Sequence, residues 1–421
     1  MHIQWIRRID YWVGIPVCFL LSILNRLESW LGIRKITTDP PRKILFMLIS
    51  ELGSTVVAHP AFRKVQETYP TAEYYFLVFH ENREIVTLLN LMPESHILTL
   101  RKKSFVHFVT DTLRVLWRLR KERIDTVIDY ELFSRFSNII SFLSGAVRRI
   151  GFYRFHMEGL YRGNLVTHRV VYSQNRHMVY NFLALSHALW SPLSEQPFLK
   201  KSLKMESIQL PVIEFNEMEI AAMWQKLRRF HSRIHPQSKI VVFNPNASAL
   251  LPLRKWPLEF YGELTRKLLT DPEIYIACIG VASEKPDAQA VVQAAASDRV
   301  IDLTGETTLL ELVTLFHMGR LLITSDCGPA HIACLTKIPI LIFFGPETPS
   351  LFAPLSPHAK ILSEDYACSP CVSVYNHRFS ACTNNLCLQS ITPDTVFAAA
   401  KEMLEQDTAQ SSQRIFNSLS L

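Results

Sequence analysis

Short apolar runs alternate with amphipathic stretches through the first half of the chain. The apolar runs that predict strands are Ile44–Ser50, Tyr74–Phe79, Ile97–Leu100 and Asp125–Asp129. The stretches that predict helices run from after the loop Glu51–Thr55 to about Tyr69, over Phe105–Lys121 and over Leu132–Leu143. Continuous apolar strands separated by helices are typical of a parallel sheet with both faces covered. This half therefore predicts a doubly wound α/β domain.

The second half repeats this alternation. Predicted strands are Ile240–Asn244, Ile274–Ile279, Val300–Leu303, a run that begins at Leu321, and Ile340–Phe344. Predicted helices are Pro257–Leu269, Asp287–Ala296, Leu309–Met318 and one that begins with Pro329. The 421 residues suffice for two domains, and the pattern weakens between Ser191 and Leu210. We predict two Rossmann-like α/β domains, residues 37–205 and 206–400, and a C-terminal tail in residues 401–421.

The first 36 residues differ from the rest. Arg7 and Arg8 precede an apolar run of 14 residues, Tyr11–Leu24, and a second apolar patch surrounds Trp30. A comfortable membrane span needs about 20 residues, and no small-residue cleavage site follows the run. We interpret residues 1–36 as an interfacial, membrane-associating helix that leaves the body cytoplasmic. A short spanning helix and a helix packed on the globular body remain alternatives.

Composition bears on the partners of the chain. Hydrophobic residues make up 48% of it, which predicts a sizeable folded core. The net charge of +7 favours anionic partners such as nucleotides, phosphorylated glycans or acidic lipid surfaces. No zinc finger, RNP-type aromatic motif or basic tail is present, so nucleic acid is not an expected partner.

A polar turn of the second domain is the first candidate binding site. Asp326, Cys327 and Gly328 follow a predicted strand, and a helix begins at Pro329. Free backbone N–H groups at a helix start, beside a glycine that permits close approach, suit a phosphate. His331 can add a donor to the same anion. The alternatives are an ordinary strand–helix turn without a ligand and a histidine packed in the core.

Three further loops of the second domain follow predicted strands and carry polar residues or glycine. Their candidate donor-binding residues are Asn246, Ser248 and Arg254 in the first, Gly280 and Glu284 in the second, and Thr307 in the third. Ligands bind outside the carboxyl ends of parallel strands, so all four loops are expected to share one crevice. Amides, hydroxyls and a cation suit a nucleotide diphosphate, and a carboxylate suits ribose hydroxyls. Arg254 on a solvated loop and Glu284 as a helix cap are the alternatives.

Common nucleotide motifs are missing from the sequence. It contains neither a G-x-G-x-x-G after the first strand nor a Walker A loop, which argues against a dinucleotide dehydrogenase and an NTPase. It also lacks a D-x-D pattern for a metal-bound diphosphate. The nearest acidic pair is Asp129 and Glu131 in the first domain.

Several segments resemble one known family. The segment TSDCGPAHIACLTKIPILIFFGPETP closely resembles the D-[TS]-G-x-x-H-x-A-x-x-x-x-x-P…FGP signature of glycosyltransferase family 9, the bacterial ADP-heptose:lipopolysaccharide heptosyltransferases and their relatives. FNPNASALLPLRKWPLEFYGEL and LTGETTLLEL are similar to two further family segments, and ILFMLISELGSTVVAHPAFRKVQETYPTAEYYFLV is similar to the family's opening strand, loop and helix. The resemblance covers about residues 40–400.

The resemblance implies a type B glycosyltransferase fold, with two Rossmann-like domains facing a cleft. It implies a donor nucleotide sugar on the second domain, and on the first an acceptor that is a lipid-linked or cell-surface glycan such as lipopolysaccharide core. The implied reaction is an inverting, metal-independent transfer of a sugar, with heptose among the candidates, and no cofactor besides the donor. Arg254 and the amides of Cys327–Ala330 would stabilise the departing diphosphate. The implied location is the cytoplasmic face of the bacterial inner membrane.

The first-domain loop departs from the family pattern. The family usually has Gly-Asp there, with the aspartate as general base, whereas this chain has Gly53 and Ser54. Serine is a poor base at neutral pH, so the nearest carboxylate on the loop, Glu51, is the predicted catalytic base. His59 and Glu131 are the next candidates. A non-catalytic nucleotide- or glycan-binding relative without a base is the alternative function.

Four of the eight cysteines crowd into one late segment. They are Cys368, Cys371, Cys382 and Cys387, and His377 lies between them. The C-x-x-C pair suits a structural zinc site. The irregular spacing of the other two cysteines suits reduced structural thiols in a cytoplasmic protein equally well, and a disulfide less so.

Overall fold

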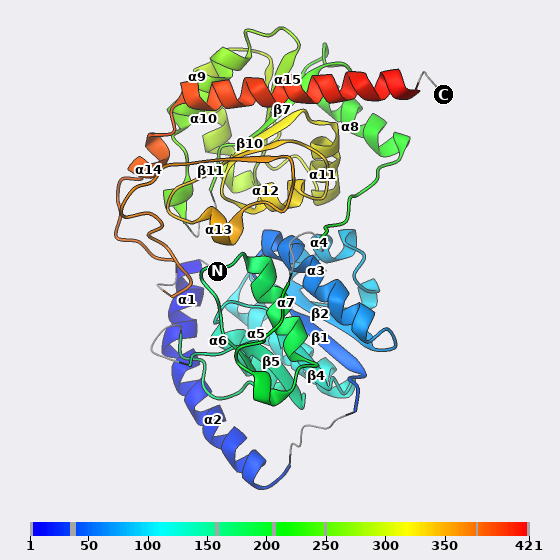
Figure 1. Cartoon of the computed structure of the whole chain (residues 1–421), viewed down its shortest axis with the longest axis vertical. Coiled ribbons are helices and arrows are strands. Elements are labelled where there is room, and N and C mark those ends of the chain that lie inside the picture. Colours follow the sequence, from blue (N-terminus) through cyan, green and yellow to red (C-terminus); the bar gives the residue numbers. More distant parts are fainter. Residues whose placement is uncertain are drawn as a thin grey trace. The chain divides into compact units, whose positions relative to one another are not determined.

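The chain folds into two compact units. The structure, a computed structural model, describes residues 3–33, 39–155, 160–203, 208–247, 251–375 and 378–418. The units are Met1–Gln209 and Leu210–Leu421, coloured from blue to green and from green to red in Figure 1. The boundary lies shortly after the predicted one at 205/206. The N-terminal helices belong to the first unit, and α15 (Pro393–Ser418) runs without a break through residue 400, where the tail was predicted to begin.

The first unit contains a six-stranded parallel sheet in the order β3-β2-β1-β4-β5-β6. Its strands are β1 (Lys43–Met47), β2 (Glu73–Phe79), β3 (Ile97–Leu100), β4 (Thr126–Asp129), β5 (Arg148–Phe152) and β6 (His168–Val170). Its helices are α1 (Ile3–Trp12), α2 (Gly14–Trp30), α3 (Leu52–Thr68), α4 (Arg83–Leu88), α5 (Phe105–Lys121), α6 (Arg135–Leu143) and α7 (Met178–Ala188).

Alternate residues of these strands build two cores. On one face, Leu45 and Met47 pack with Val115 and Leu119 of α5 and Ile140 of α6. On the other face, aromatic side chains stack between the sheet and helices α3 and α7, with the Phe46 and Phe62 ring centroids 5.1 Å apart. Helices therefore cover both faces, as the continuous apolar strands predict.

The N-terminal helices pack on the first unit with one side only. Cys18 contacts Phe142 and Leu165 in a small buried cluster. Gly163 has a φ of 72°, and a Cβ there would lie 2.6 Å from the Cys18 carbonyl oxygen, so only glycine permits this close approach. The segment Arg8–Trp30 has 23 residues and the length and composition to cross a membrane, and only 11% of its most apolar 18-residue stretch is buried. The N-terminal helices thus pack on the globular body, which is one of the three predicted arrangements. Their outer side is apolar, as the other two arrangements require.

The second unit contains a parallel sheet in the order β12-β11-β10-β7-β8-β9. Its strands are β7 (Lys239–Asn244), β8 (Ile274–Cys278), β9 (Val300–Asp302), β10 (Leu321–Ser325), β11 (Ile340–Phe344) and β12 (Ala359–Ser363). Its helices besides α15 are α8 (Glu217–Phe230), α9 (Leu258–Leu268), α10 (Lys285–Ala295), α11 (Leu309–Met318), α12 (Gly328–Ala333), α13 (Pro349–Phe352) and α14 (Leu386–Gln389). Helices α9, α10 and α15 cover one face, and α12 packs against β10 and β11.

Two predicted elements of the first unit need correction. The stretch Glu51–Thr55 is not a loop, because α3 begins at Leu52 and takes up most of it. The helix predicted from Leu132 begins only at Arg135, because Phe133 has a φ of 57°. That left-handed conformation cannot continue a right-handed helix.

Candidate active site

Asn244, at the end of β7, organises the strand ends of the second unit. Its side-chain nitrogen lies 3.1 Å from Thr324 Oγ1 and 2.9 Å from Cys327 Sγ. This buried network connects β7 with β10, which pair in parallel. The Cys327 thiol therefore faces the protein interior, and burial raises its pKa to about 11. The thiol stays protonated at neutral pH, so any contribution of Cys327 to an anion site comes from its backbone.

Two buried polar side chains at this edge make no hydrogen bond within the described residues. Asn246 is 2% exposed and Thr304 is 1% exposed. The carboxamide oxygen and nitrogen of Asn246 and the hydroxyl of Thr304 are all without a partner there. Both side chains meet at Gly280, where a Cβ would lie 2.8 Å from Asn246 Nδ2 and 3.3 Å from Thr304 Cγ2. Buried polar groups are normally paired, so this corner suits a ligand that supplies hydrogen bonds.

Glu284 and Gly305 complete this corner. Glu284 Oε2 accepts a hydrogen bond from the Val281 N–H at 2.9 Å, which is the capping role given above as the alternative. The same oxygen would lie 2.8 Å from a Cβ at Gly280, so the carboxylate also borders the corner. Gly305 has a φ of 77° and donates its N–H to the Gly280 carbonyl at 2.9 Å. A side chain at Gly305 would strain this contact between the loops after β8 and β9.

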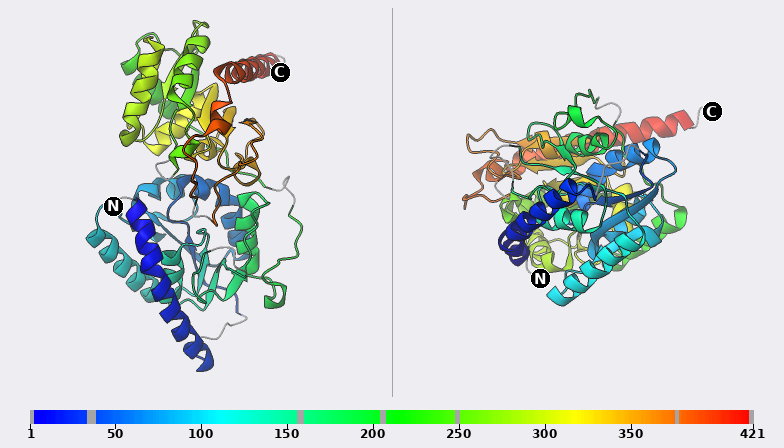
Figure 2. Two further views of the ribbon diagram at one scale, coloured as in Figure 1. Left: turned by 90° about the vertical axis from the view of Figure 1, so that its left-hand side faces the viewer. Right: turned by 90° about the horizontal axis from the view of Figure 1, so that it is seen from below.

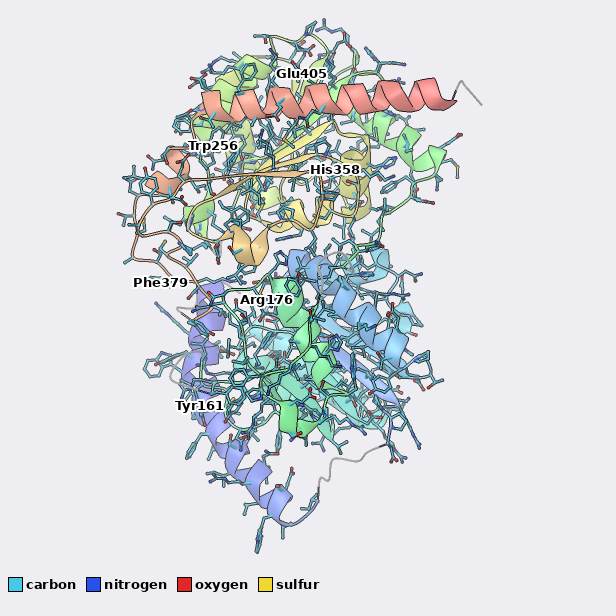
Figure 3. All side chains as sticks on the ribbon, viewed as in Figure 1. Tyr161, Arg176, Trp256, His358, Phe379 and Glu405 are labelled. Carbon is cyan, nitrogen blue, oxygen red and sulfur yellow. The ribbon has the colours of Figure 1, made fainter. Side chains whose placement is uncertain are left out.

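Arg254 forms a buried ion pair with Asp326. Its Nη1 lies 3.0 Å from Asp326 Oδ2, and the two side chains are 14% and 5% exposed. The Nε of Arg254 has no hydrogen-bond partner among the described residues, so one donor remains for an anion. Trp256, labelled in Figure 3, fixes the loop: its indole N–H donates to the Ile391 carbonyl at 2.9 Å and its backbone N–H to Ser325 Oγ at 3.3 Å.

Helix α12 begins at Gly328, with Pro329 in its first turn, close to the predicted position. It is only six residues long, so its dipole is weaker than a long helix would provide. A Cβ at Gly328 would meet no atom within 4 Å, which leaves room for a phosphate to approach the backbone. His331 is a buried residue of this helix. An anion site here thus depends more on Arg254 and the open turn than on the helix.

The structure does not bring every predicted residue into this group. Thr307 is half-buried in the loop before α11, and no described contact connects its side chain with Asn246 or Arg254. Lys255 pairs with Asp287 at 2.5 Å. Ser248 lies outside the described residues. Asn244 and Thr304 belong to the predicted strand-end loops, although neither is among the candidate donor-binding residues selected from the sequence.

In the first unit, Glu51 lies at the N-terminus of α3, beyond the carboxyl end of β1. Its Oε2 accepts a hydrogen bond from Ser54 Oγ at 2.5 Å. Its backbone carbonyl accepts one from Thr55 Oγ1 at 3.2 Å. Ser54, which stands where an aspartate is usual in the family, therefore holds the carboxylate of Glu51 instead of acting as a base.

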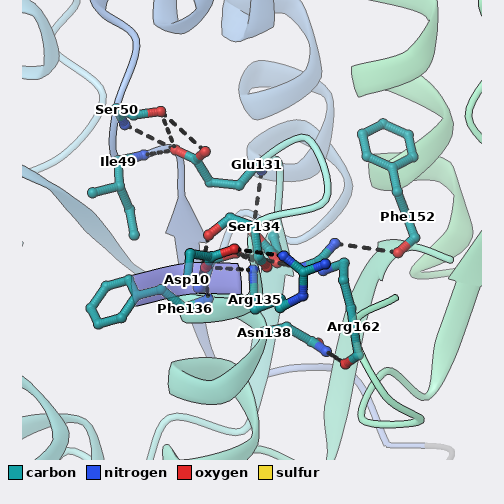
Figure 4. A network of polar contacts seen from close by, with 12 residues as sticks. Asp10, Ile49, Ser50, Glu131, Ser134, Arg135, Phe136, Asn138, Phe152 and Arg162 are labelled. Carbon is teal, nitrogen blue, oxygen red and sulfur yellow. Dashed lines mark hydrogen bonds and ion pairs between the residues drawn. The ribbon is translucent and has the colours of Figure 1, made fainter. Parts of the chain in front are cut away.

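Glu131, after β4, lies against the loop that carries Glu51 (Figure 4). Its Oε1 accepts hydrogen bonds from the N–H groups of Ile49 at 2.6 Å and Ser50 at 2.9 Å. Burial, and then the negative charge of Glu51, raise the pKa of Glu131 to about 7. Two neighbouring carboxylates, one of them titrating near neutral pH, are typical of sites that move protons.

The other acid–base candidates of the first unit are poorly suited to catalysis. Burial lowers the pKa of His59 to about 4, which makes it a weak base. Asp129 is fully buried, is paired with Arg162, and accepts a hydrogen bond from Ser137 Oγ at 2.7 Å. Both carboxylate oxygens of Asp129 are thus already engaged by Arg162, Ser137 and the Glu131 N–H.

The late cysteines are free thiols. Cys368 and Cys382 are exposed, Cys371 is half-buried and Cys387 is buried. Within the described part of the chain, no three His, Cys, Asp or Glu residues are placed to hold a metal ion. His377 lies outside the described residues. Among the residues that the structure describes, the four sulfurs are thus not gathered with other ligands into the zinc site considered above.

One family model and several solved structures are similar to this chain. A family model described as glycosyltransferase family 9 (heptosyltransferase) matches residues 112–378. The solved structure of ADP-heptose lps heptosyltransferase II from Escherichia coli has a TM-score of 0.66 and 21% identity, and covers 87% of this chain and 99% of that chain. The glycosyl transferase family 9 structure from Veillonella parvula has the same TM-score, with 17% identity over 87% of this chain and 97% of that one. These likenesses confirm the predicted fold of two parallel-sheet α/β domains.

Sequence relatives carry related names. Lipooligosaccharide heptosyltransferase 2 of Haemophilus influenzae is 27% identical over 169 residues, which are 39% of this chain and 48% of that protein. The lipopolysaccharide core heptosyltransferase OpsX of the same species is 21% identical over 328 residues, 77% of this chain and 85% of that protein. The chain thus spans about half the length of the first relative. Because the family model covers more than half of the chain and includes the strand-end loops with Arg254, Gly280 and Asp326, the chain belongs to glycosyltransferase family 9.

Proposed function

We propose that this chain is a glycosyltransferase that moves a sugar from a nucleotide-diphosphate donor onto a lipid-linked or cell-surface glycan such as lipopolysaccharide core. The observation that carries the proposal is the corner at Gly280, where the buried and unpartnered groups of Asn246 and Thr304 converge. These groups suit the hydroxyls and ring nitrogens of a nucleoside. Family membership and relatives named as heptosyltransferases make a heptose the first sugar to test.

The proposed reaction divides between the two units. On the second unit, Arg254 and the turn at Gly328 bind the diphosphate. On the first, Glu51 removes the proton of an acceptor hydroxyl as its oxygen attacks the anomeric carbon. The bond from that carbon to the phosphate oxygen breaks, the nucleotide diphosphate leaves, and attack from the opposite side inverts the anomeric centre. Arg254 compensates the charge on the leaving group, so the proposed transfer uses no metal ion.

An assay with isotope-labelled donors tests this function. The full-length protein is incubated with a panel of nucleotide-diphosphate sugars, including ADP-heptose, and with lipopolysaccharide-core acceptors, in the presence and absence of excess EDTA. We expect transfer with one donor, and equal rates with and without EDTA. Donor binding without any transfer would favour the non-catalytic relative, and a loss of activity in EDTA would reject the metal-independent mechanism.

The membrane forms part of this proposal. We propose that α1 and α2 hold the protein at the cytoplasmic face of a bacterial inner membrane, where a lipid-linked acceptor is available. In support, α2 and its flanks expose large apolar side chains on the side away from the first unit, and Trp12 and Trp30 are 73% and 84% exposed. Tryptophan is favoured at the membrane–water interface.

The open turn at Gly328 allows a specific prediction. Gly328→Ala adds a methyl group that meets no protein atom, so the free energy of unfolding should change by less than about 1 kcal/mol. If a phosphate occupies that space, overpacking should weaken donor binding by about tenfold to a hundredfold. Isothermal titration with the donor identified in the transfer assay measures this effect, and urea unfolding measures stability. Unchanged affinity would place the diphosphate elsewhere.

A further inference from the structure

Helix α5 has apolar side chains on two sides. Val115 and Leu119 are buried against the sheet of the first unit. On the outer side, a row of four apolar residues at intervals of three or four positions is exposed to solvent. This row, called here the outer stripe, consists of Val106, Val109, Leu113 and Trp117, which are 68%, 37%, 62% and 62% exposed. A surface helix normally carries polar residues on that side, so a contiguous apolar row indicates an interaction surface.

Basic groups border the outer stripe. The Lys121 ammonium lies 5.0 Å from the centroid of the Trp117 ring. Arg118 and Arg120 donate to backbone carbonyls of Ser95 and Leu143, so they keep their positive charge uncompensated by these contacts. The carboxylates on or next to this helix already have basic partners: Asp111 pairs with Arg101 and Arg114, and Glu122 pairs with Lys43. The surface is therefore apolar along its centre and positive at its C-terminal end.

The outer stripe lies near the N-terminal helices. Helix α6 packs against α5 on one side, with the Phe108 and Phe136 ring centroids 4.9 Å apart. On its other side, α6 packs against α2, through Ile139 and Leu143 beside Cys18. Helices α5 and α1–α2 thus both pack against α6 within the first unit, and Figure 2 shows that unit in two further views. Helix α6 thus links the helix that carries the outer stripe to the N-terminal helices.

We propose that the outer stripe of α5 is a second membrane-binding surface, which inserts into the headgroup region of a bilayer rich in anionic lipid. Apolar side chains flanked by tryptophan and basic groups suit this interface, because the apolar groups enter the lipid while the cations contact phosphates. A second copy of this chain is a poorer fit, because a two-fold interface on the stripe would bring like charges together. The surface does not depend on the chemistry proposed for the strand ends.

Vesicle binding by the full-length protein tests this surface. The vesicles contain phosphatidylethanolamine with phosphatidylglycerol, or phosphatidylcholine alone. Leu113→Glu should lower the partition coefficient for the anionic vesicles by about tenfold, because it removes an apolar group that would enter the lipid and adds a charge that anionic lipid repels. Met218→Glu on α8 is the matched control: Met218 is 78% exposed, so the same charge is added at an apolar surface residue of the other unit. It should leave binding within about twofold of wild type.

A fluorescence measurement tests the same surface without added charge. Brominated phosphatidylglycerol should quench wild-type tryptophan emission, and Trp117→Phe should remove part of that quenching while binding persists. Both substituted side chains are exposed, so urea midpoints should match wild type. Wild-type vesicle binding by Leu113→Glu, identical quenching in Trp117→Phe, or a dimer in sedimentation equilibrium that Leu113→Glu dissociates would each overturn the proposal.

Discussion

Replacement of Glu51 by glutamine should lower the turnover number by about a hundredfold to ten-thousandfold, the range typical for loss of a general base. Glutamine keeps the shape of the side chain and can still accept the hydrogen bond from Ser54 Oγ, which lies 2.5 Å from the carboxylate. The geometry of the loop should therefore survive, and only the proton acceptor is lost. Single-turnover transfer from the identified donor measures the effect, and titration with that donor should give an unchanged affinity.

A rescue experiment separates loss of the base from damage to the loop. The double variant Glu51→Gln/Ser54→Asp places a carboxylate where the family usually has one, and should recover a large part of the lost turnover. The matched variant Glu51→Gln/Ser54→Asn should not. Near-normal turnover in Glu51→Gln would reject Glu51 as the base. Glu131, whose pKa is raised to about 7 by burial and by the charge of Glu51, would then be the next residue to test.

Replacement of Arg254 by methionine should reduce kcat/KM by about a hundredfold to a thousandfold, because charge on the departing diphosphate loses a preorganised donor. The same change leaves the Asp326 carboxylate without its partner in a nearly buried position. Breaking a buried pair from one side lowers the free energy of unfolding by about 3–5 kcal/mol. Initial rates and urea unfolding report the two effects separately.

A double variant assigns these two effects to their causes. Arg254→Met/Asp326→Leu removes both charges, so stability should return toward wild type while activity stays low. Lys255→Met is the matched control on the same loop. Its ion pair with Asp287 is more exposed, so the variant should lose little of either property. If Arg254→Met/Asp326→Leu regained both stability and turnover, Arg254 would have only a structural role.

The pattern of apolar and polar residues predicted most strands. It missed elements in which polar residues enter a strand or in which the sequence has no clear periodicity. Strand β5 was missed because it begins with two arginines, Arg148 and Arg149, which make the segment appear polar. The sequence does not show the buried partners of these arginines, such as the Leu165 carbonyl, to which Arg149 Nε donates at 2.6 Å. Strand β6 has only three residues. Helix α7 is buried on nearly all sides and lacks an amphipathic pattern.

The candidate site divides in the same way. The rule that ligands bind beyond parallel strand ends selected Asn246, Gly280, Arg254 and Asp326 as candidates, because it requires only that the strands run parallel. The same rule does not predict the direction in which each side chain points. Whether Cys327 faces a ligand or the interior depends on the neighbouring strand, where Asn244 and Thr324 engage its sulfur. Likewise, the position of Glu131 against Ile49 follows from the pairing of β1 with β4.

The close packing of α2 against Gly163 affects how the first unit would be held at a membrane. A Cβ at Gly163 would come within 2.6 Å of the Cys18 carbonyl oxygen, and the Asn25 side chain donates to the Asn164 carbonyl at 2.7 Å. Helix α2 is thus fixed firmly to the globular body of the first unit. If α1 and α2 bind a membrane as proposed, the bilayer would therefore determine the orientation of the whole first unit. It would also keep Glu51 at a fixed distance from the membrane surface, in which lipid-linked acceptors diffuse.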